Sequence, residues 1–132
     1  MMNGDVLTKV NFEHLLSFHK DQLGIATMCI REYDIQIPFG VVDIEKNKVK
    51  GFLEKPVKKF FINAGIYVFE KEMINSVKVD QYIDMPNLLE QQIKKGKNVS
   101  VFPIHEYWKD VGQMKDYQSA NNSFANEFSL DD

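Results

Sequence analysis

The sequence has few of the residues and patterns that mark several common classes of protein. Its 132 residues include one cysteine, Cys29, which can form no intramolecular disulfide and is expected to be a small buried hydrophobic residue. No apolar run approaches the ~20 residues that span a bilayer, and no basic segment followed by an apolar one opens the chain. These absences predict a protein without membrane contact and favour a cytoplasmic location.

An excess of charge of one sign is also missing. Lys and Arg number 16 and Asp and Glu 19, so the net charge is −3 and predicts no attraction to nucleic acid or to an anionic membrane. No Gly-x-Ser-x-Gly motif or local Cys-His pair supplies a nucleophile. His14 and His19 miss the i, i+4 spacing of a helical metal pair, and His105 falls in an expected loop, so none of the three is expected to bind metal.

What is present alternates between strand-like and helix-like patterns. Helices are expected at 11–22, 71–76, between Asp84 and Gly96, and at 114–124, and strands at 26–33, 60–70 and 98–104. Two further strands flank a polar turn at 45–48. This order predicts an α/β sheet that is partly parallel, with an inserted antiparallel hairpin. Residues 1–124 are expected to form one domain, and residues 125–132 a frayed tail.

Two aspartates lie where such sheets bind ligands, beyond the carboxyl ends of strands. Asp5 is expected to end a first strand just after Gly4, and Asp110 follows Trp108, with Gly112 just beyond. Two carboxylates from distant parts of a chain suit Mg²⁺, which takes one or two of them and fills its other positions with water and phosphate oxygens. The same residues also fit a turn and a helix cap, and spacing alone favours that simpler interpretation.

Three further motifs are open to two interpretations each. Lys55 can neutralise a phosphate and Glu54 can accept hydrogen bonds from sugar hydroxyls, but such a pair is also common at a solvated strand end. Gly65, just after Asn63 in a strand, marks either the close approach of a ligand or a bulge. Gly40 is either a turn glycine or a point where a ligand rests against bare backbone.

Taken in order, however, the motifs resemble the sugar-1-phosphate nucleotidylyltransferase family. The matching segments are MNGDVLT, IPFGVV, GFLEKP, FINAGIYVF, DMPNLLEQQIKKG and FPIHEYWKDVGQMKDYQSAN, which extend from Met1 to Asn122. The resemblance implies an incomplete Rossmann-like sheet in a three-layer α/β/α arrangement. It also implies transfer of a nucleotidyl group from a nucleoside triphosphate to a sugar-1-phosphate, with Mg²⁺ as cofactor and pyrophosphate as the second product. FINAGIYVF and HEYWKDVG look closest to the branch that activates mannose- or glucose-type sugars, often with GTP.

The resemblance implies a role for each matched residue. Asp5 and Asp110 look like the metal-binding aspartates, and Lys55 resembles the lysine that meets the sugar's phosphate, so these three are the catalytic candidates. The residues that look like substrate contacts are Gly40, Glu54, Lys55, Asn63 and Trp108. No protein nucleophile is required, because positioning and charge neutralisation supply most of the catalysis in phosphoryl transfer.

In the family, a glycine-rich loop that cradles the triphosphate comes before the strand that ends at the aspartate. No such loop occurs in these 132 residues. We therefore expect the sugar-binding C-terminal part of such an enzyme, inactive or impaired alone, with a sheet edge near Met1 that promotes self-association into a homo-oligomer. Its expected partners are a sugar-1-phosphate and a nucleoside triphosphate or nucleotide sugar. The alternative is a non-catalytic module of the same fold that binds sugar nucleotides or assembles with a partner.

Overall fold

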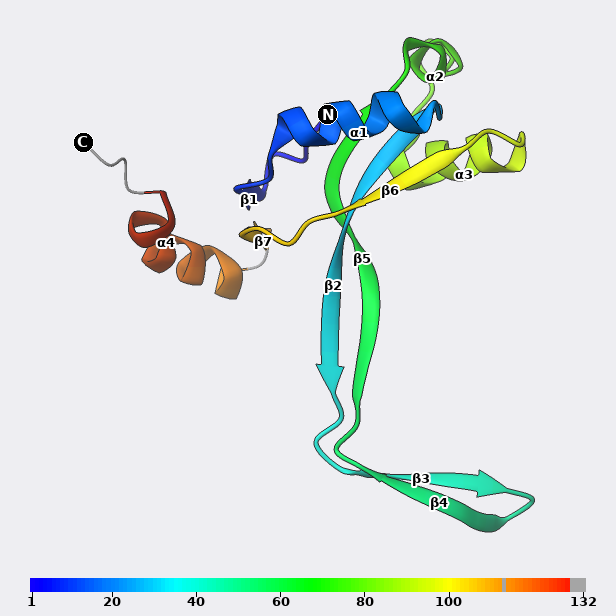
Figure 1. Cartoon of the computed structure of the whole chain (residues 1–132), viewed down its shortest axis with the longest axis vertical. Helices are drawn as coiled ribbons and strands as arrows, with labels where there is room; N and C mark the ends of the chain where they lie inside the picture. The colour runs from blue at the N-terminus through cyan, green and yellow to red at the C-terminus, as the bar shows by residue number, and fades with distance from the viewer. Residues whose placement is uncertain (113, 129–132) are drawn as a thin grey trace.

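The computed structural model describes residues 1–112 and 114–128, leaving aside the side chains of residues 114–117, 122, 125 and 126. A body of helices and short strands carries a long two-stranded arm (Figure 1). The strands are β1 (Val6–Thr8), β2 (Ala26–Gln36), β3 (Gly40–Glu45), β4 (Lys48–Glu54), β5 (Val57–Phe69), β6 (Val99–Pro103) and β7 (Trp108–Asp110). The helices are α1 (Phe12–Gln22), α2 (Lys71–Asn75), α3 (Met85–Lys94) and α4 (Met114–Phe128).

The strands form three small sheets. In the central sheet the order is β5–β2–β6, with β2 antiparallel to β5 and parallel to β6. β3 and β4 form an antiparallel hairpin, and β1 pairs antiparallel with β7. The predicted mixed α/β structure, with a parallel pair and an inserted hairpin, is confirmed.

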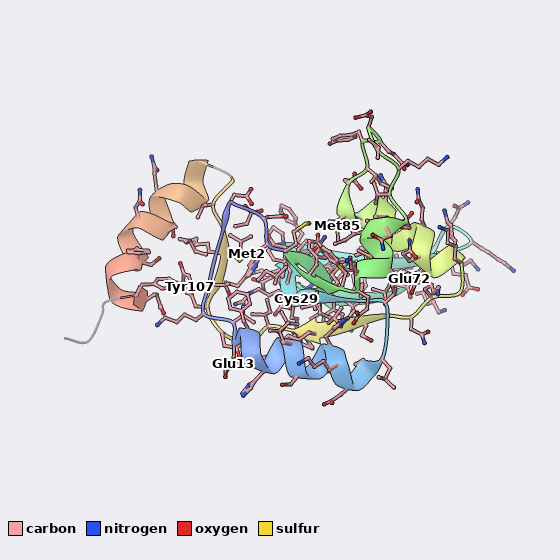
Figure 2. All side chains as sticks on the ribbon, turned by 90° about the horizontal axis from the view of Figure 1, so that it is seen from above. Met2, Glu13, Cys29, Glu72, Met85 and Tyr107 are labelled. Atoms are coloured by element: carbon pink, nitrogen blue, oxygen red, sulfur yellow. The ribbon has the colours of Figure 1, made fainter. Side chains whose placement is uncertain are left out.

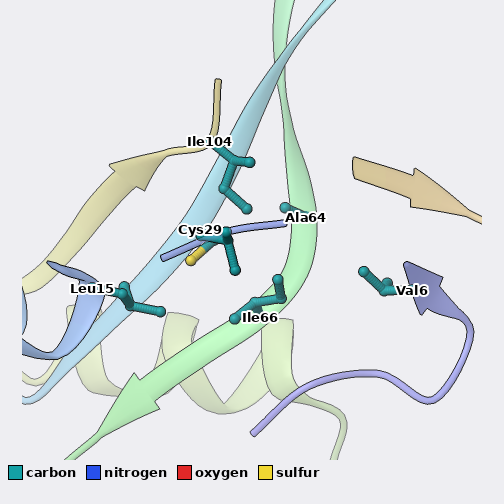
Figure 3. Close-up of a cluster of buried hydrophobic side chains, with 7 residues drawn as sticks. Val6, Leu15, Cys29, Ala64, Ile66 and Ile104 are labelled. Carbon is teal, nitrogen blue, oxygen red and sulfur yellow. The ribbon is translucent and has the colours of Figure 1, made fainter. Parts of the chain in front are cut away.

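Two clusters of buried side chains lie on opposite faces of the central sheet. On one face Leu15 of α1 packs with Cys29 and Ile66 (Figure 3). On the other face Met73 of α2 packs with Ala26 and with the apolar side of α3. Because Ala26 and Cys29 are three residues apart in β2, their side chains point to opposite faces. Helices therefore cover both faces of this sheet, with α1 on one side and α2 and α3 on the other (Figure 2).

Local signals set the helix limits. The Asn11 side chain accepts a hydrogen bond from the His14 amide at 3.0 Å, and Asp84 accepts one from the Asn87 amide at 2.9 Å. Both are N-caps, which satisfy backbone donors at a helix start. Within α1, His19 is buried, and its two ring nitrogens contact the Thr27 hydroxyl and the Glu70 carboxylate at 2.9 Å each. His19 is thus a structural link between α1, β2 and the end of β5.

The arm consists of residues 31–62 and is longer than the sequence pattern predicts. β2 continues to Gln36 instead of residue 33, and β5 begins at Val57 instead of residue 60, because their ladder runs on to the Gln36–Val57 pair. At the tip, Lys46 and Asn47 have φ values of 48° and 62°. Two consecutive residues with positive φ are typical of the two-residue hairpin turn whose twist matches that of the strands. The predicted turn at 45–48 is confirmed.

Two expectations about the chain ends need correction. Asp5 does not end a strand: Met2 forms a single bridge with Ile66, a turn follows at 4–5, and β1 begins after Asp5. The bridge is short because only Met1 and Asn3 hydrogen bond to the edge of β5. At the other end α4 continues to Phe128, beyond the predicted limit of 124, so residues 125–128 are helical. Residues 129–132, the rest of the predicted tail, lie outside the described residues.

Candidate functional site

Asp5 and Asp110 come together through the pairing of β1 with β7. Val6 lies opposite Asp110 in this ladder, and the Val111 amide donates to the Asp5 carbonyl at 2.8 Å. The Thr8 hydroxyl extends the pairing by donating to the Tyr107 carbonyl at 2.8 Å. The register therefore brings the two aspartates to the same end of this small sheet.

Gly112 shows how closely the two carboxylates converge. A Cβ atom built on Gly112 would lie 2.9 Å from Asp5 Oδ2 and 3.0 Å from Asp110 Oδ1. The Gly112 amide also donates to Asp110 Oδ1 at 2.8 Å, which fixes the orientation of that carboxylate. Two carboxylate oxygens therefore border one small space above bare glycine backbone. We call Asp5 and Asp110 the acid pair.

The charges at this point favour a cation. Both aspartates are exposed, and among the described side chains neither forms an ion pair with a basic residue. Like charges held near one another repel, and a divalent ion between them removes that repulsion. In the described part of the chain, no group of three or more His, Cys, Asp or Glu side chains has the arrangement of a metal site. An oxygen-only pair suits Mg²⁺, which commonly binds through one or two carboxylates and keeps several waters.

The segment around Gly65 supports the acid pair from β5. The β2–β5 register shifts between Met28 and Ile30, so β5 bulges at this point. Asn63 stabilises the bulge, since its oxygen accepts from the Gly65 amide at 2.9 Å and its amide donates to the Tyr67 hydroxyl at 2.6 Å. The structure shows the bulge, one of the two interpretations that the sequence leaves open, and Asn63 as a substrate contact stays a prediction. Asn63 itself is exposed, and both of these hydrogen bonds lie within β5.

Gly65 itself has a φ of 72°, and a Cβ atom there would lie 2.7 Å from the Asn3 side-chain nitrogen. The backbone amide of Asn3 donates to the Gly65 carbonyl at 2.9 Å. The bare backbone of Gly65 thus leaves room for Asn3, and Asn3 precedes the turn that presents Asp5. Gly65 positions one half of the acid pair indirectly.

Trp108 anchors β7, the strand that ends at Asp110. Its indole nitrogen donates to the Ala64 carbonyl at 2.8 Å, which ties β7 to the bulge in β5. The Arg31 guanidinium lies 6.0 Å from the centre of the indole ring and donates to the Glu106 carbonyl at 2.8 Å. Trp108 therefore holds the strand that ends at Asp110, and its role as a substrate contact stays a prediction.

Gly40, Glu54 and Lys55 lie elsewhere. Gly40 pairs with Glu54 at the base of the β3–β4 hairpin, and a Cβ atom on Gly40 would approach the Glu54 carboxylate to 3.3 Å. Lys55 follows with a φ of 42° in the link between β4 and β5. The six residue steps of β5 from Val57 to Asn63 alone correspond to roughly 20 Å. The structure does not bring these three residues together with the acid pair, because the arm extends away from the body (Figure 1).

Sequence reasoning missed the parts played by three residues. Gly112 was noted only as a neighbour of Asp110, although a glycine two residues after an aspartate is a usable signal for bare backbone beside a carboxylate. Asn3 gives no signal of its own in the sequence, because its packing against Gly65 depends on a distant strand. Arg31 gave no signal in the sequence, because its contacts are with residues far along the chain.

Comparison with known proteins identifies the family of this chain. The nucleotidyl transferase family model matches residues 1–127. The chain belongs to this family. Among its relatives, the mannose-1-phosphate guanyltransferase of Kluyveromyces lactis is 32% identical over 141 residues, covering 100% of this chain and 38% of the relative. The glucose-1-phosphate adenylyltransferase of Clostridium kluyveri is 28% identical, covering 96% of this chain and 36% of the relative.

Two solved structures share the fold of this chain. A protein assigned as a glucose-1-phosphate thymidylyltransferase from Bacillus anthracis superposes with a TM-score of 0.67 at 19% identity, covering 99% of this chain and 55% of the other. HddC from Yersinia pseudotuberculosis, solved with GMP-PN, gives 0.62 at 23% identity, covering 93% and 53%. The nucleotidyl transferase chain described here spans little more than a third of the length of these curated relatives. None of the helices in its described part is long and apolar enough to cross a membrane.

Proposed function

We propose that this chain forms the cation- and sugar-phosphate-binding part of a sugar-1-phosphate nucleotidylyltransferase. The whole reaction would transfer a nucleotidyl group from a nucleoside triphosphate to a sugar-1-phosphate and release pyrophosphate. The convergence of Asp5 and Asp110 above Gly112 carries this proposal. Family membership and the named activities of the relatives support it.

Asp5 and Asp110 would hold Mg²⁺ between them. When bound, the ion neutralises the negative charge of phosphate oxygens. The residues of the chain do the positioning. The β1–β7 ladder fixes the spacing of the two carboxylates, the Gly112 amide orients Asp110, and Trp108 ties the second strand to the body. Such prior orientation lowers the barrier because the reacting groups need not be ordered again in each turnover.

The choice of sugar and nucleotide is a finer proposal. Several relatives carry the name mannose-1-phosphate guanyltransferase, and GMP-PN is bound to the solved HddC. A mannose- or glucose-type sugar-1-phosphate with a guanine nucleotide is therefore our first choice of substrates. Gly40, Glu54 and Lys55 as sugar-phosphate contacts stay predictions from their motif, because the structure places them on the arm.

Titration calorimetry tests the acid pair directly. Mg²⁺ and Mn²⁺ would be titrated into the wild-type chain and into Asp5→Asn and Asp110→Asn. Asp21→Asn, which changes an exposed aspartate of α1 outside the site, is the matched control. We expect cation binding in the wild type and the control, and its loss in both site variants. Equal binding in all four chains would refute the proposed metal site.

A second set of titrations identifies the substrate and separates the two functional hypotheses. Mannose-1-phosphate, glucose-1-phosphate and GDP-mannose would each be added with and without Mg²⁺, and pyrophosphate release from GTP would be measured in parallel. Binding that needs Mg²⁺ and is lost in Asp110→Asn would support the proposed part of an enzyme, whether or not the chain turns over alone. Binding that needs neither Mg²⁺ nor Asp110 would favour the non-catalytic module of the same fold, for which the exposed apolar arm is a specific observation.

A further inference from the structure

Arg31 is the only arginine in the chain. Lysine and arginine together number 16, and all of them except Arg31 are lysines. The two side chains bind anions differently. The ammonium of lysine is a compact point charge, whereas the planar guanidinium carries five N–H donors in a rigid fork that matches the oxygens of a phosphate or a carboxylate. What this one fork can bind depends on where the fold places it.

Arg31 lies where β2 leaves the body, on the face of the sheet that carries β1 and β7. Side chains alternate along a strand, so Arg31 projects to the same face as Cys29. Cys29 belongs to the buried cluster that also contains Val6, and Val6 lies opposite Asp110 in the β1–β7 ladder. The β2–β6 ladder ends at Ile30, so Arg31 is the first residue of β2 beyond it.

Trp108 gives a second, independent link between Arg31 and Asp110. The guanidinium lies 6.0 Å from the centre of the indole ring, at the outer limit of a cation–π contact. Trp108 and Asp110 are alternate residues of β7, so their side chains project to one side of the strand, roughly 7 Å apart along it. Arg31 therefore lies on the side of β7 from which Asp110 projects.

The guanidinium is held in place, yet most of its donors are unused. Its Nη1 nitrogen donates to the Glu106 carbonyl at 2.8 Å, and within the described part of the chain Arg31 makes no other side-chain hydrogen bond. Among the described side chains, no carboxylate forms an ion pair with it. The side chain is also partly exposed. Most of its five N–H groups are therefore available to an acceptor from outside the chain.

The charges on this side of β7 are of opposite sign. The acid pair presents two carboxylates that suit a divalent cation, and Arg31 presents a positive charge beside the indole. A ligand that carries phosphate matches both, because some of its oxygens can bind the cation while others accept from the guanidinium fork. An unphosphorylated sugar matches neither of them.

We propose that Arg31 binds the phosphate group of a phosphorylated sugar whose cation is held by the acid pair. This role rests on the proposed function, and it assigns a phosphate contact in the body of the chain, separate from Lys55 on the arm. The Glu106 carbonyl and the indole of Trp108 orient the guanidinium before the ligand arrives. Such prior orientation lowers the entropy that is lost when the contact forms.

Titration calorimetry in the presence of Mg²⁺ tests this contact, with mannose-1-phosphate, glucose-1-phosphate and GDP-mannose as ligands. Arg31→Gln should raise the dissociation constant by about tenfold or more, because it removes charge-assisted hydrogen bonds. Arg31→Lys should lose less, since it keeps the charge without the fork. The control Lys58→Gln removes an exposed charge of the arm and should stay within about twofold. A larger loss for GDP-mannose than for the sugar-1-phosphates would assign the contact to the diphosphate.

Chemical modification of the unaltered chain covers the case in which an Arg31 variant fails to fold. Phenylglyoxal modifies arginine side chains, and Arg31 is the only one present. Peptide mapping by mass spectrometry measures the rate at which the adduct forms. Mg²⁺ with a bound phosphorylated sugar, at ten times its dissociation constant, should slow this modification by about tenfold, because only the free chain reacts. Mg²⁺ with mannose should leave the rate unchanged.

The results separate this proposal from the proposed function. If the wild-type chain binds Mg²⁺ and a phosphorylated sugar, but the sugar neither protects Arg31 nor binds less tightly to Arg31→Gln, the role of Arg31 is refuted and the acid pair stands. If Mg²⁺ binds and no phosphorylated sugar does, the role of Arg31 is refuted as well. Protection of Arg31 by a sugar phosphate in a chain that binds no cation would refute the metal site and retain the Arg31 contact.

Discussion

The body and the arm are built from similar strands but have opposite surroundings. β2 passes through both: Ala26 and Cys29 are fully buried in the body, whereas Tyr33 and Ile35 are about half exposed in the arm. Apolar residues run almost without interruption from Ala26 to Ile30 in the body, whereas they alternate with polar residues from Arg31 to Gln36 in the arm, and the β2–β5 ladder joins the two parts. The difference comes from the helices, since α1, α2 and α3 cover only the body. A continuous apolar run thus accompanies the part of the strand that is covered on both faces, and alternation accompanies the part that is not.

The largest expected effect is the contrast between a core side chain and an arm side chain. Met73 is fully buried, so Met73→Ala should lower the free energy of unfolding by about 2–5 kcal/mol through lost burial and a cavity. Phe61 lies in the arm and is 72% exposed. Phe61→Ala should therefore lower the free energy of unfolding by less than about 0.5 kcal/mol. Urea denaturation at low chain concentration measures both. Similar losses would mean that the arm is as well packed as the body.

The next effect lies at the bulge beside the acid pair. Gly65→Ala places a side chain at a φ of 72° and pushes against Asn3, so we expect a loss of about 1–3 kcal/mol in stability. Because Asn3 leads into the Asp5 turn, cation affinity should fall as well. Gly51→Ala, where a Cβ atom meets nothing within 4 Å, is the control in the arm. Unchanged cation binding in Gly65→Ala would show that Asn3 does not position Asp5.

The ionisation of Cys29 reports how well the body excludes water from its core. Burial raises the pKa of the Cys29 thiol from 9.0 to about 12. The unfolded chain loses this proton first, so the stabilising contribution is complete below pH 9.0 and falls as pH rises toward 12, by up to about 1.4 kcal/mol per pH unit. Comparing the pH dependence of the free energy of unfolding in the wild type and in Cys29→Ala isolates the contribution of this thiol.

Thiol labelling makes the same comparison between the two regions. At pH 8 an aromatic disulfide reagent should modify Cys29 only as fast as the body opens. A cysteine placed on the arm as Phe61→Cys, in a Cys29→Ala background, should react at once. Fast labelling of Cys29 in the folded chain would show that the reagent reaches β2 without unfolding of the body.

The smallest effect is expected at the arm tip. Lys46 and Asn47 both have positive φ, so replacing them with Asn-Gly relieves strain and should stabilise the hairpin by about 0.5–1 kcal/mol. Amide exchange in β3 and β4 should slow, while the midpoint of global unfolding stays the same because the hairpin lies outside both cores. A rise in that midpoint would show that the arm unfolds together with the body.

Features set by neighbouring residues were predictable from the sequence. Asp84 and Pro86 at the start of α3, and the turn at Lys46 and Asn47, depend on nearby backbone and are confirmed. The β1–β7 pairing was not predicted, since it depends on contacts between strands from opposite ends of the chain.

The candidate site also contains one feature that the sequence predicts and one that it does not. The order of motifs pointed to the convergence of Asp5 with Asp110, and the structure shows it. The distance of Lys55 from this pair escaped prediction, because it depends on the direction in which the β2–β5 ribbon leaves the body. Motif order carries no information about that direction.

The link between β1 and β7 has a consequence for the order of folding. The hydrogen bond from Thr8 to Tyr107 joins residues 99 apart in the sequence. Closing a flexible loop of that length costs about 4 kcal/mol of chain entropy, so the pairing gains stability only together with the packing of Val6 and Trp108 in the core on the α1 face. We therefore expect the acid pair to be lost whenever this pairing opens. A bound divalent ion would bridge those ends and act as a clasp, coupling occupancy of the site to the integrity of the whole body.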